Sequence, residues 1–152
     1  MKRILFVCTG NICRSPTAHA IARHKIKSLN LQNFEADSAG ISGFHAGEEP
    51  DSRAIEVGKS KKIDFSGIHA RQITSSDFAE FDMIFGMDRN HISILRKMCP
   101  DQFQNKIHLF LEYSGIRNNF NDEVKDPYYG GVDGFVQVFN LIEEGVEKII
   151  SE

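Results

Sequence analysis

The chain has 152 residues, 41% of them hydrophobic and 26% charged, and a formal net charge of −3 at pH 7. This length predicts a single domain over residues 1–152, large enough to bury a core without disulfide or metal cross-links. The slight acidic excess argues against non-specific binding to nucleic acid or to anionic membranes, because both require a surplus of Lys and Arg.

The cysteine content limits the class of protein further. Three cysteines, Cys8, Cys13 and Cys99, are an odd and low number for the disulfide framework of a small secreted protein. The apolar run before Cys8 covers only residues 4–7, far less than a signal sequence or a membrane span needs. Cys8 and Cys13 have no second ligand pair at zinc-binding spacing. We therefore expect a cytoplasmic protein with reduced thiols and no bound metal.

The first forty residues predict a strand, a helix and a second strand. Residues 3–8 form a continuous apolar run, which is typical of a strand buried on both faces of a parallel sheet. Ser15 and Pro16 predict a helix start, with Ser15 as the N-cap and Pro16 at the first helical position. Apolar residues at helical spacing predict its buried stripe: Ala18, Ile21, Ala22, Ile26 and Leu29. Residues 34–39 predict the second strand, which ends at Gly40.

The rest of the chain continues this alternation. The expected segments are a glycine-rich loop at 40–50, helices near 51–61 and 75–80, a strand at 82–87, a helix at 88–98, a strand at 107–111, a turn-rich stretch at 113–134 and a helix at about 134–150. The helix at 88–98 is expected to bury Ile92, Leu95 and Met98. The last helix has its apolar face on these residues: Phe135, Val138, Phe139, Ile142, Val146, Ile149 and Ile150.

This alternation predicts an α/β fold, a four-stranded parallel sheet flanked by helices on both faces. Ligands of such sheets bind at the carboxyl ends of the strands, beside a topological switch point. Cys8 lies at one such end, so the segment that follows it is the first candidate site.

Residues 8–14 are a candidate anion-binding loop. Between Cys8 and Arg14 lie Thr9, Gly10, Asn11, Ile12 and Cys13. A loop this short before a helix N-terminus directs its N–H groups inward, and the helix dipole adds to their attraction for an anion. Gly10 and Asn11 tolerate the positive φ that the curl is expected to require. Arg14 adds a planar fork that fits phosphate oxygens.

The same surroundings predict that Cys8 is a nucleophile. Helix N-termini and nearby arginines lower thiol pKa values from about 8.5 to roughly 3.5–7.5. We therefore expect Cys8 to be a thiolate at neutral pH, directed at the phosphorus of the bound group, with the Ser15 hydroxyl turned back toward the sulfur. A lone buried cysteine is usually a small hydrophobic residue, but Cys-x5-Arg-Ser-Pro between a buried strand and a helix favours catalysis.

Five segments resemble the low-molecular-weight protein-tyrosine phosphatase family. They are residues 8–16 (CTGNICRSP), 37–40 (DSAG), 70–72 (ARQ), 87–88 (MD) and 126–130 (DPYYG). They lie in order along essentially the whole chain. The resemblance implies the phosphotyrosine phosphatase I-like fold, a flavodoxin-like three-layer arrangement, and a reaction without a metal or cofactor.

The resemblance also implies a mechanism. Cys8 attacks phosphorus, displaces the tyrosine oxygen and forms a phosphocysteine, while the loop N–H groups and Arg14 stabilise the equatorial charge. Asp126 gives the leaving oxygen a proton and later takes one from the attacking water. From the residues alone, Asp126 before Pro127 predicts only a turn, so its role as the acid depends on the resemblance.

Residues outside the loop are expected to hold it in shape. Under the resemblance, Asn11, Ser15 and Ser38 share a hydrogen-bond network, and Asp88 supports the loop from another segment. Many family members have a histidine two residues before the Ala-Arg-Gln motif, whereas residues 68–69 of this chain are Ile-His. The outer part of the network is therefore expected to differ.

Aromatic side chains are expected to form the walls of the cleft. Phe44, Tyr128 and Tyr129 would enclose the ring of the substrate. Such a deep slot favours phosphotyrosine over the shorter phosphoserine. Other family members have bulkier or hydroxylated rings at the position of Phe44, so the substrate preference of this chain can differ from theirs.

Three other functions compete with tyrosine phosphatase activity. Thioredoxin-coupled arsenate reductases share the scaffold but need two further cysteines, and beyond Cys8 and Cys13 only Cys99 remains. Phosphoarginine phosphatases are associated with threonine at the position of Ile12, whose apolar side chain suits an aromatic ring, and they are the second choice. A phosphopeptide-binding module need not retain a nucleophile and an acid, so Cys8 and Asp126 argue against it.

The expected partners follow from the resemblance. They are phosphotyrosine-containing proteins as substrates and inorganic phosphate or similar oxyanions as products or inhibitors, with the chain itself a monomer. Cys13 could form a disulfide with an oxidised Cys8 and protect it from irreversible oxidation. A packed small residue at this position is an equally good interpretation.

Overall fold

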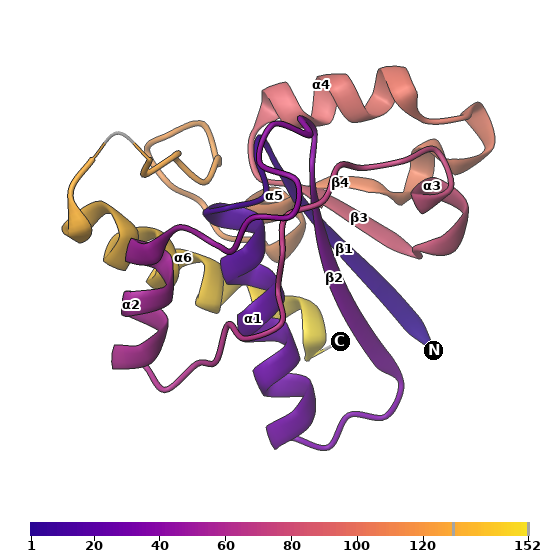
Figure 1. Ribbon diagram of the computed structural model, residues 1–152. Helices are drawn as coiled ribbons and strands as arrows, with labels where there is room; N and C mark the ends of the chain where they lie inside the picture. Colours follow the sequence, from indigo (N-terminus) through magenta and orange to yellow (C-terminus); the bar gives the residue numbers. More distant parts are fainter. Residues whose placement is uncertain (129, 152) are drawn as a thin grey trace.

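The computed structural model describes residues 1–128 and 130–151 (Figure 1). Four strands form one sheet in the order β2-β1-β3-β4, and the neighbouring pairs are parallel. The strands are β1 (Lys2–Cys8), β2 (Phe34–Gly40), β3 (Met83–Gly86) and β4 (Ile107–Leu109). The four-stranded parallel sheet predicted from the alternating pattern is therefore confirmed.

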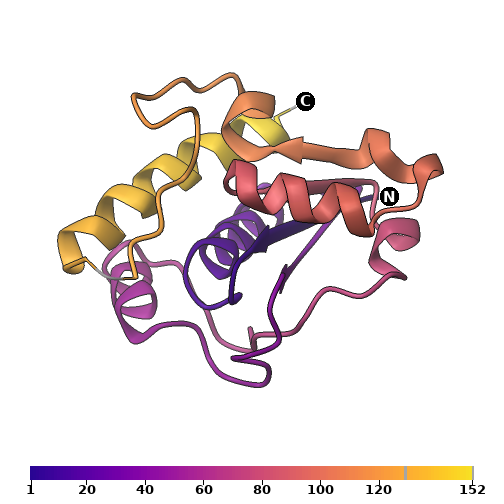
Figure 2. The ribbon, with the colours of Figure 1, turned by 90° about the horizontal axis from the view of Figure 1, so that it is seen from above.

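Helices cover both faces of this sheet. They are α1 (Arg14–Ser28), α2 (Ser52–Ser60), α3 (Asp77–Glu80), α4 (Arg89–Met98), the 3-10 helix η1 (Asp101–Lys106), α5 (Phe110–Ser114) and α6 (Val132–Ile150). Helices α1, α2, α5 and α6 pack on one face, and α3, α4 and η1 pack on the other (Figures 1 and 2). In the described part of the chain, none of the helices has the length and apolar character needed to cross a membrane.

Strand β1 is buried on both faces because its side chains alternate between the two helical layers. Ile4 and Phe6 pack into the core with α1 and α6, whereas Leu5 and Val7 pack against the α3–α4 side. All four side chains are 0% exposed, which explains why the strand is continuously apolar in sequence. Cys8 ends the strand on the α1 side.

The carboxyl end of β1 is the topological switch point of the sheet. The chain passes from β1 through α1 to β2 on one side, while β3 lies on the other side of β1. The Ile41 N–H donates to the Cys8 carbonyl and the Ser42 N–H to the Thr9 carbonyl, each at 2.9 Å. These bonds tie the loop after β2 to the loop after β1, and they frame the crevice where ligands of such sheets bind.

Helix α1 begins two residues earlier than its sequence predicts. Its first residue is Arg14 and its N-cap is Cys13, so the prediction of Ser15 as the N-cap is wrong. The curled loop brings Ser15 inside the first turn, where its Oγ lies 2.7 Å from Asn11 Nδ2 and 3.0 Å from Cys8 Sγ. The hydroxyl therefore serves the loop and the sulfur rather than the helix end.

The predicted buried faces are confirmed except near helix and strand ends. The seven apolar residues predicted to be buried in α6 are all buried. Leu29 is 63% exposed and Met98 is 42% exposed, so the prediction that they are buried is wrong. Each lies at the end of a helix, where the apolar stripe leaves the sheet. Cys99 is buried in place of Met98. The last strand ends at Leu109 rather than at residue 111, because Phe110–Ser114 forms α5 and packs on α6.

Candidate active site

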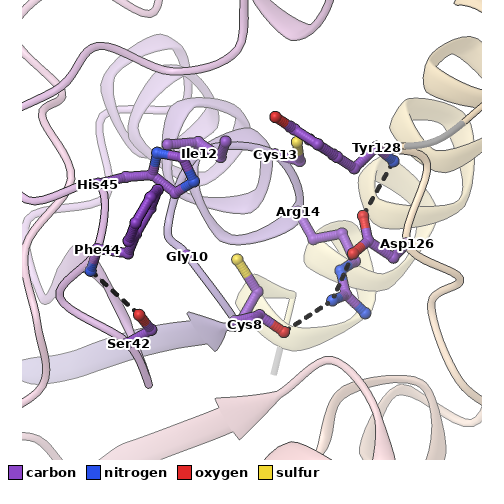
Figure 3. Close-up of a pocket in the computed structure, with 11 residues that line it drawn as sticks. Cys8, Gly10, Ile12, Cys13, Arg14, Ser42, Phe44, His45, Asp126 and Tyr128 are labelled. Carbon is purple, nitrogen blue, oxygen red and sulfur yellow. Dashed lines mark hydrogen bonds and ion pairs between the residues drawn. The ribbon is translucent and has the colours of Figure 1, made fainter.

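A cavity of about 360 Å³ opens at the carboxyl end of β1 (Figure 3). It is lined by Cys8, Thr9, Gly10, Ile12, Cys13, Arg14, Ser42, Phe44, His45, Asp126 and Tyr128. These residues come from the loop after β1, the loop after β2 and the segment before α6. The fold therefore brings three separate stretches of the chain to one crevice, and the predicted loop forms its floor.

Asn11 and Gly10 give the loop its shape in two different ways. Asn11 has φ 58°, a left-handed conformation that asparagine adopts more readily than most residues, so this part of the prediction is confirmed. Its buried side chain accepts from Arg71 N–H at 3.0 Å and donates to Ser15 Oγ at 2.7 Å. Gly10 keeps φ outside the left-handed region; a Cβ there would instead lie 2.9 Å from His45 Cδ2. A side chain at position 10 would therefore displace the His45 ring.

The sulfur of Cys8 is surrounded by hydrogen-bond donors. Its residue is only 3% exposed, and the sulfur lies 3.0 Å from Ser15 Oγ and 3.4 Å from the Ser15 amide. Because Asn11 donates to the Ser15 oxygen, the hydroxyl proton can point at the sulfur or at the Ala39 carbonyl, 3.4 Å away. The sulfur also lies beside the start of α1, where the helix dipole is positive. The Ser15 hydroxyl, the Ser15 amide and the start of α1 therefore all lie beside this sulfur.

Arg14 is held rigidly beside this sulfur. Its side chain is 3% exposed, and Nη1 donates to Asp88 Oδ2 and to the Val124 carbonyl, both at 2.9 Å. Nη2 makes longer contacts, 3.4 Å to Thr9 Oγ1 and 3.6 Å to Asp126 Oδ2. One nitrogen therefore anchors the guanidinium, and the other lies among side chains that line the cavity (Figure 3).

His91 completes the support of Arg14, and no sequence pattern singled it out. Asp88 is the N-cap of α4; its carboxylate accepts from His91 N–H at 2.9 Å, and its own N–H donates to His91 Nδ1 at 3.2 Å. Because Nδ1 accepts, the ring proton is on Nε2, which donates to Thr9 Oγ1 at 2.9 Å. His91 thus contacts both Asp88 and Thr9, which in turn contact Arg14. The spacing of the capping box, with histidine as the third helical residue, was the available signal.

One buried histidine, His91, and one half-buried histidine, His19, predict that the protein is less stable in mild acid. Burial, with the nearby charge of Arg14, lowers the pKa of His91 from 6.5 to about 4 against the opposing charges of Asp88 and Asp126. Burial also lowers the pKa of His19 to about 4. The unfolded chain therefore binds more protons than the folded protein between about pH 6.5 and 4. The free energy of unfolding should fall as the pH falls through this window, by up to about 1.4 kcal/mol per pH unit for each histidine.

Urea unfolding at several pH values between 7 and 4 measures this effect. Each of the variants His19→Asn and His91→Asn should reduce the dependence of the unfolding free energy on pH, because each removes one group with a lowered pKa. His24, which is exposed, provides the control, and His24→Asn should leave the dependence unchanged. Equal pH dependence in all four proteins would show that His19 and His91 titrate normally.

Asp126 and the aromatic residues lie above the loop. Asp126 has a side chain that is 42% exposed; its Oδ2 is 3.6 Å from Arg14 Nη2, and its Oδ1 accepts from the Tyr128 N–H at 3.0 Å. Phe44 is 83% exposed and Tyr128 is 38% exposed, and they approach the cavity from different sides (Figure 3). Tyr129, the third predicted wall residue, lies outside the described residues.

The predicted network around Ser38 has a different arrangement. The expected bond between Asn11 and Ser15 is present at 2.7 Å, whereas Ser38 Oγ lies 2.9 Å from His19 Nδ1 instead of contacting that pair directly. The link to the loop passes through Arg71, whose N–H donates to Asn11 Oδ1 while its guanidinium is 3.1 Å from the neighbouring Asp37. The backbone amide of Arg71 therefore supports the loop through Asn11.

The two residues that depart from the family pattern lie in different environments. Ile68 is 3% exposed and packs in the core beside α1 and α6, whereas His69 is exposed. Ile68 therefore fills apolar space, while the Arg71 amide supplies the hydrogen bond to Asn11.

Cys13 is buried in the same loop, at 6% exposure. Burial, followed by the charge of Asp51 and the proximity of Cys8, raises its pKa, so it remains a protonated thiol at neutral pH. Within residues 1–128 and 130–151, no group of three or more His, Cys, Asp or Glu side chains is arranged to hold a metal ion.

Comparisons with known proteins agree with one another. A family profile described as low molecular weight phosphotyrosine protein phosphatase matches residues 3–152. The low molecular weight protein-tyrosine-phosphatase YfkJ of Bacillus subtilis is 39% identical, covering 99% of this chain and 95% of the relative. A crystal structure of protein tyrosine phosphatase from Entamoeba histolytica is similar with a TM-score of 0.91 and 39% identity, covering 99% of this chain and 96% of that one. The Drosophila arginine phosphatase DARP is similar with a TM-score of 0.89 and 34% identity, covering 99% of this chain and 96% of that one.

Proposed function

This chain belongs to the low-molecular-weight phosphotyrosine protein phosphatase family, and on that premise we propose that Cys8, Arg14 and Asp126 hydrolyse phosphotyrosine through a phosphocysteine intermediate. The observation that carries this assignment is that a buried sulfur, a fixed guanidinium and an exposed carboxyl group line one cavity, although they come from separate segments. Together they supply a nucleophile, positive charge and a proton donor.

In the first step the Cys8 thiolate attacks phosphorus, and the bond between phosphorus and the tyrosine oxygen breaks. Asp126 gives that oxygen its proton, so tyrosine leaves as a neutral phenol. Acid catalysis of this kind contributes roughly 10²–10⁴-fold. Asp126 is suited to this task because its side chain is partly exposed and lies above Arg14, where it can reach a group that enters from solvent.

In the second step water attacks the phosphocysteine, Asp126 takes a proton from that water, and the bond between phosphorus and sulfur breaks. The electron pair returns to the sulfur, so the thiolate must be a good leaving group. The Ser15 amide and hydroxyl, 3.4 and 3.0 Å from the sulfur, are placed to stabilise it at this moment. Inorganic phosphate then leaves the cavity, and it or a similar oxyanion can bind again as an inhibitor.

Charge on the transferred phosphoryl group is stabilised by groups that need little rearrangement. The N–H groups of the loop and the start of α1 supply fixed dipoles, and Arg14 is already oriented by Asp88 and Val124. Preorganised donors of this kind need no reorientation toward the substrate during the reaction. This accounts for hydrolysis without a metal ion or cofactor.

The cavity walls favour an aromatic phosphate ester. With the phosphoryl group against the loop, a phenyl ring would extend between Phe44 and Tyr128, whereas the phosphoryl group of the shorter phosphoserine would not reach Cys8. We infer that the substrates are phosphotyrosine-containing proteins and that the chain acts in the cytoplasm as a monomer of one domain, residues 1–152.

Phosphotyrosine and phosphoarginine peptides of the same sequence test the substrate class. The second candidate is phosphoarginine, because the arginine phosphatase DARP has a similar structure. The apolar Ile12 lines the cavity and gives no hydrogen bond to a guanidine, so we expect kcat/KM to favour phosphotyrosine by at least about tenfold.

A matched variant sharpens this comparison. Ile12→Thr places a hydroxyl in the cavity and should move the ratio of the two kcat/KM values toward phosphoarginine. Faster cleavage of the phosphoarginine peptide by the unaltered protein would reject phosphotyrosine as its preferred substrate.

A further inference from the structure

Arg53 joins α2 to the segment that carries Asp126. This acid segment consists of residues 126–128 and 130–131. Arg53 Nη1 donates to the Gly130 carbonyl at 3.1 Å. The guanidinium carbon also lies 5.5 Å from the centre of the Tyr128 ring and 4.4 Å from that of Phe135, in the first turn of α6. One side chain therefore contacts the acid segment at two points and the helix that follows it.

The other edge of Arg53 is fixed by Asp51. Nε donates to Asp51 Oδ1 at 3.0 Å and Nη2 to Oδ2 at 2.9 Å, a bidentate pair that sets the plane of the guanidinium. Asp51 is also the N-cap of α2, and its own N–H donates to the Ile12 carbonyl at 2.7 Å. Arg53 thus connects the acid segment to the phosphate-binding loop, with Asp51 as the link between them.

Asp126 depends on the segment that Arg53 holds. Among the described residues, its carboxylate accepts a hydrogen bond from the Tyr128 N–H at 3.0 Å and forms a longer ion pair with Arg14 at 3.6 Å. The Gly130 N–H closes the turn by donating to the Pro127 carbonyl at 3.0 Å. The bond from Arg53 to the Gly130 carbonyl therefore holds the same short turn whose other end orients Asp126.

We propose that Arg53 is a positioning residue that sets the distance of Asp126 from the substrate's leaving oxygen. This inference rests on the proposed function, in which Asp126 is the general acid. Arg53 is not among the described residues that line the cavity, so it acts through the acid segment and not on the reacting atoms. Binding Asp51 along one edge and the Gly130 carbonyl with a further nitrogen requires the planar fork of arginine, which lysine lacks.

A series of aryl phosphates separates this role from a merely structural one. The ratio kcat/KM reports formation of the phosphocysteine, the step in which the phenolate leaves. Phenyl phosphate needs a proton on its leaving oxygen, because phenols of this type have a pKa of about 10, whereas 2,4-dinitrophenolate leaves unprotonated. Arg53→Ala should lower kcat/KM for phenyl phosphate by about tenfold or more, and for 2,4-dinitrophenyl phosphate by less than about threefold. Arg53→Lys should behave like the alanine variant.

Arg23→Ala is the matched control. Arg23 also donates to a distant backbone carbonyl, that of Asp64 at 2.8 Å, but it has no contact with the acid segment. This variant should keep the kcat/KM of the unaltered protein on both substrates. Thermal melting of all variants shows whether each is folded at the assay temperature.

The Asp126→Asn variant makes the failure of this inference distinguishable from the failure of the proposed function. If Arg53 acts through Asp126, then Arg53→Ala has no further effect on phenyl phosphate once Asp126→Asn is present. The role of Arg53 would be overturned if Arg53→Ala lowered kcat/KM equally for both aryl phosphates. It would also be overturned if the effects of the two single variants on kcat/KM for phenyl phosphate were fully additive in the double variant. If Asp126→Asn itself lowered kcat/KM equally for both aryl phosphates, the assignment of Asp126 as the acid would be wrong instead.

Discussion

Replacing Cys8 with serine should abolish hydrolysis of p-nitrophenyl phosphate while leaving phosphate binding measurable. Serine is nearly the same size, so the loop and the bonds around Ser15 and Asn11 should remain. Its hydroxyl is a far weaker nucleophile than a thiolate at neutral pH and a poorer leaving group in the second step. The expected loss in kcat is on the order of 10⁴-fold or more, as for other catalytic nucleophiles.

Turnover and calorimetric titration with inorganic phosphate together measure this prediction. Cys99→Ser provides the control, because Cys99 is a buried free thiol on the opposite side of the sheet. It should retain nearly full activity. Wild-type turnover by the Cys8→Ser variant would mean that another group attacks phosphorus, and loss of phosphate binding would mean that the substitution disturbs the loop itself.

Replacing Arg14 with lysine should be the second most damaging change. Lysine keeps the positive charge but loses the planar fork, so it cannot bond Asp88 and the Val124 carbonyl with one nitrogen while offering another to a phosphate. Arginines that stabilise phosphoryl transfer contribute roughly 10³–10⁵-fold to kcat. We expect a fall in kcat of about 10³-fold for Arg14→Lys with p-nitrophenyl phosphate, and weaker inhibition by inorganic phosphate.

The control for this change is Arg96→Lys. Arg96 is an exposed residue of α4 that contacts Gln104 and is not among the described residues that line the cavity. Both variants should be compared by thermal melting, because Arg14 is buried against Asp88 and a misplaced charge there would destabilise the fold. A folded Arg14→Lys variant with more than about a tenth of wild-type kcat would contradict the assigned role.

Local patterns in the sequence identify the main elements and the floor of the site. The apolar run of β1 predicts a strand buried on both faces, and the structure buries Ile4 to Val7 between two helical layers. The alternation of strands and helices predicts the parallel sheet, and the short spacing from Cys8 to Arg14 predicts the loop. These features depend on residues within a few positions of one another, so the chain order alone contains them.

Helix ends were less predictable, because several groups compete for the same polar side chains. Ser15 has the residue type and position of an N-cap, yet the loop places it inside α1 beside Asn11 and Cys8. Gly10 has the residue type of a left-handed position, yet its φ is not left-handed, and a Cβ there would instead meet the His45 ring at 2.9 Å. The curl of the loop decided the role of Ser15, and a side chain from the loop after β2 limits the space at Gly10.

The sequence by itself determined a parallel α/β fold and a cysteine and an arginine at the mouth of its first strand. Only the tertiary structure decided what surrounds them. Asp88 holds Arg14 across 74 residues, His91 reaches Thr9 across 82, and Arg53 reaches Gly130 across 77. The physical reason is that a hydrogen bond or a stacked ring depends on distances of a few ångströms, and the packing of the helices on the sheet fixes those distances between segments that chain order leaves far apart.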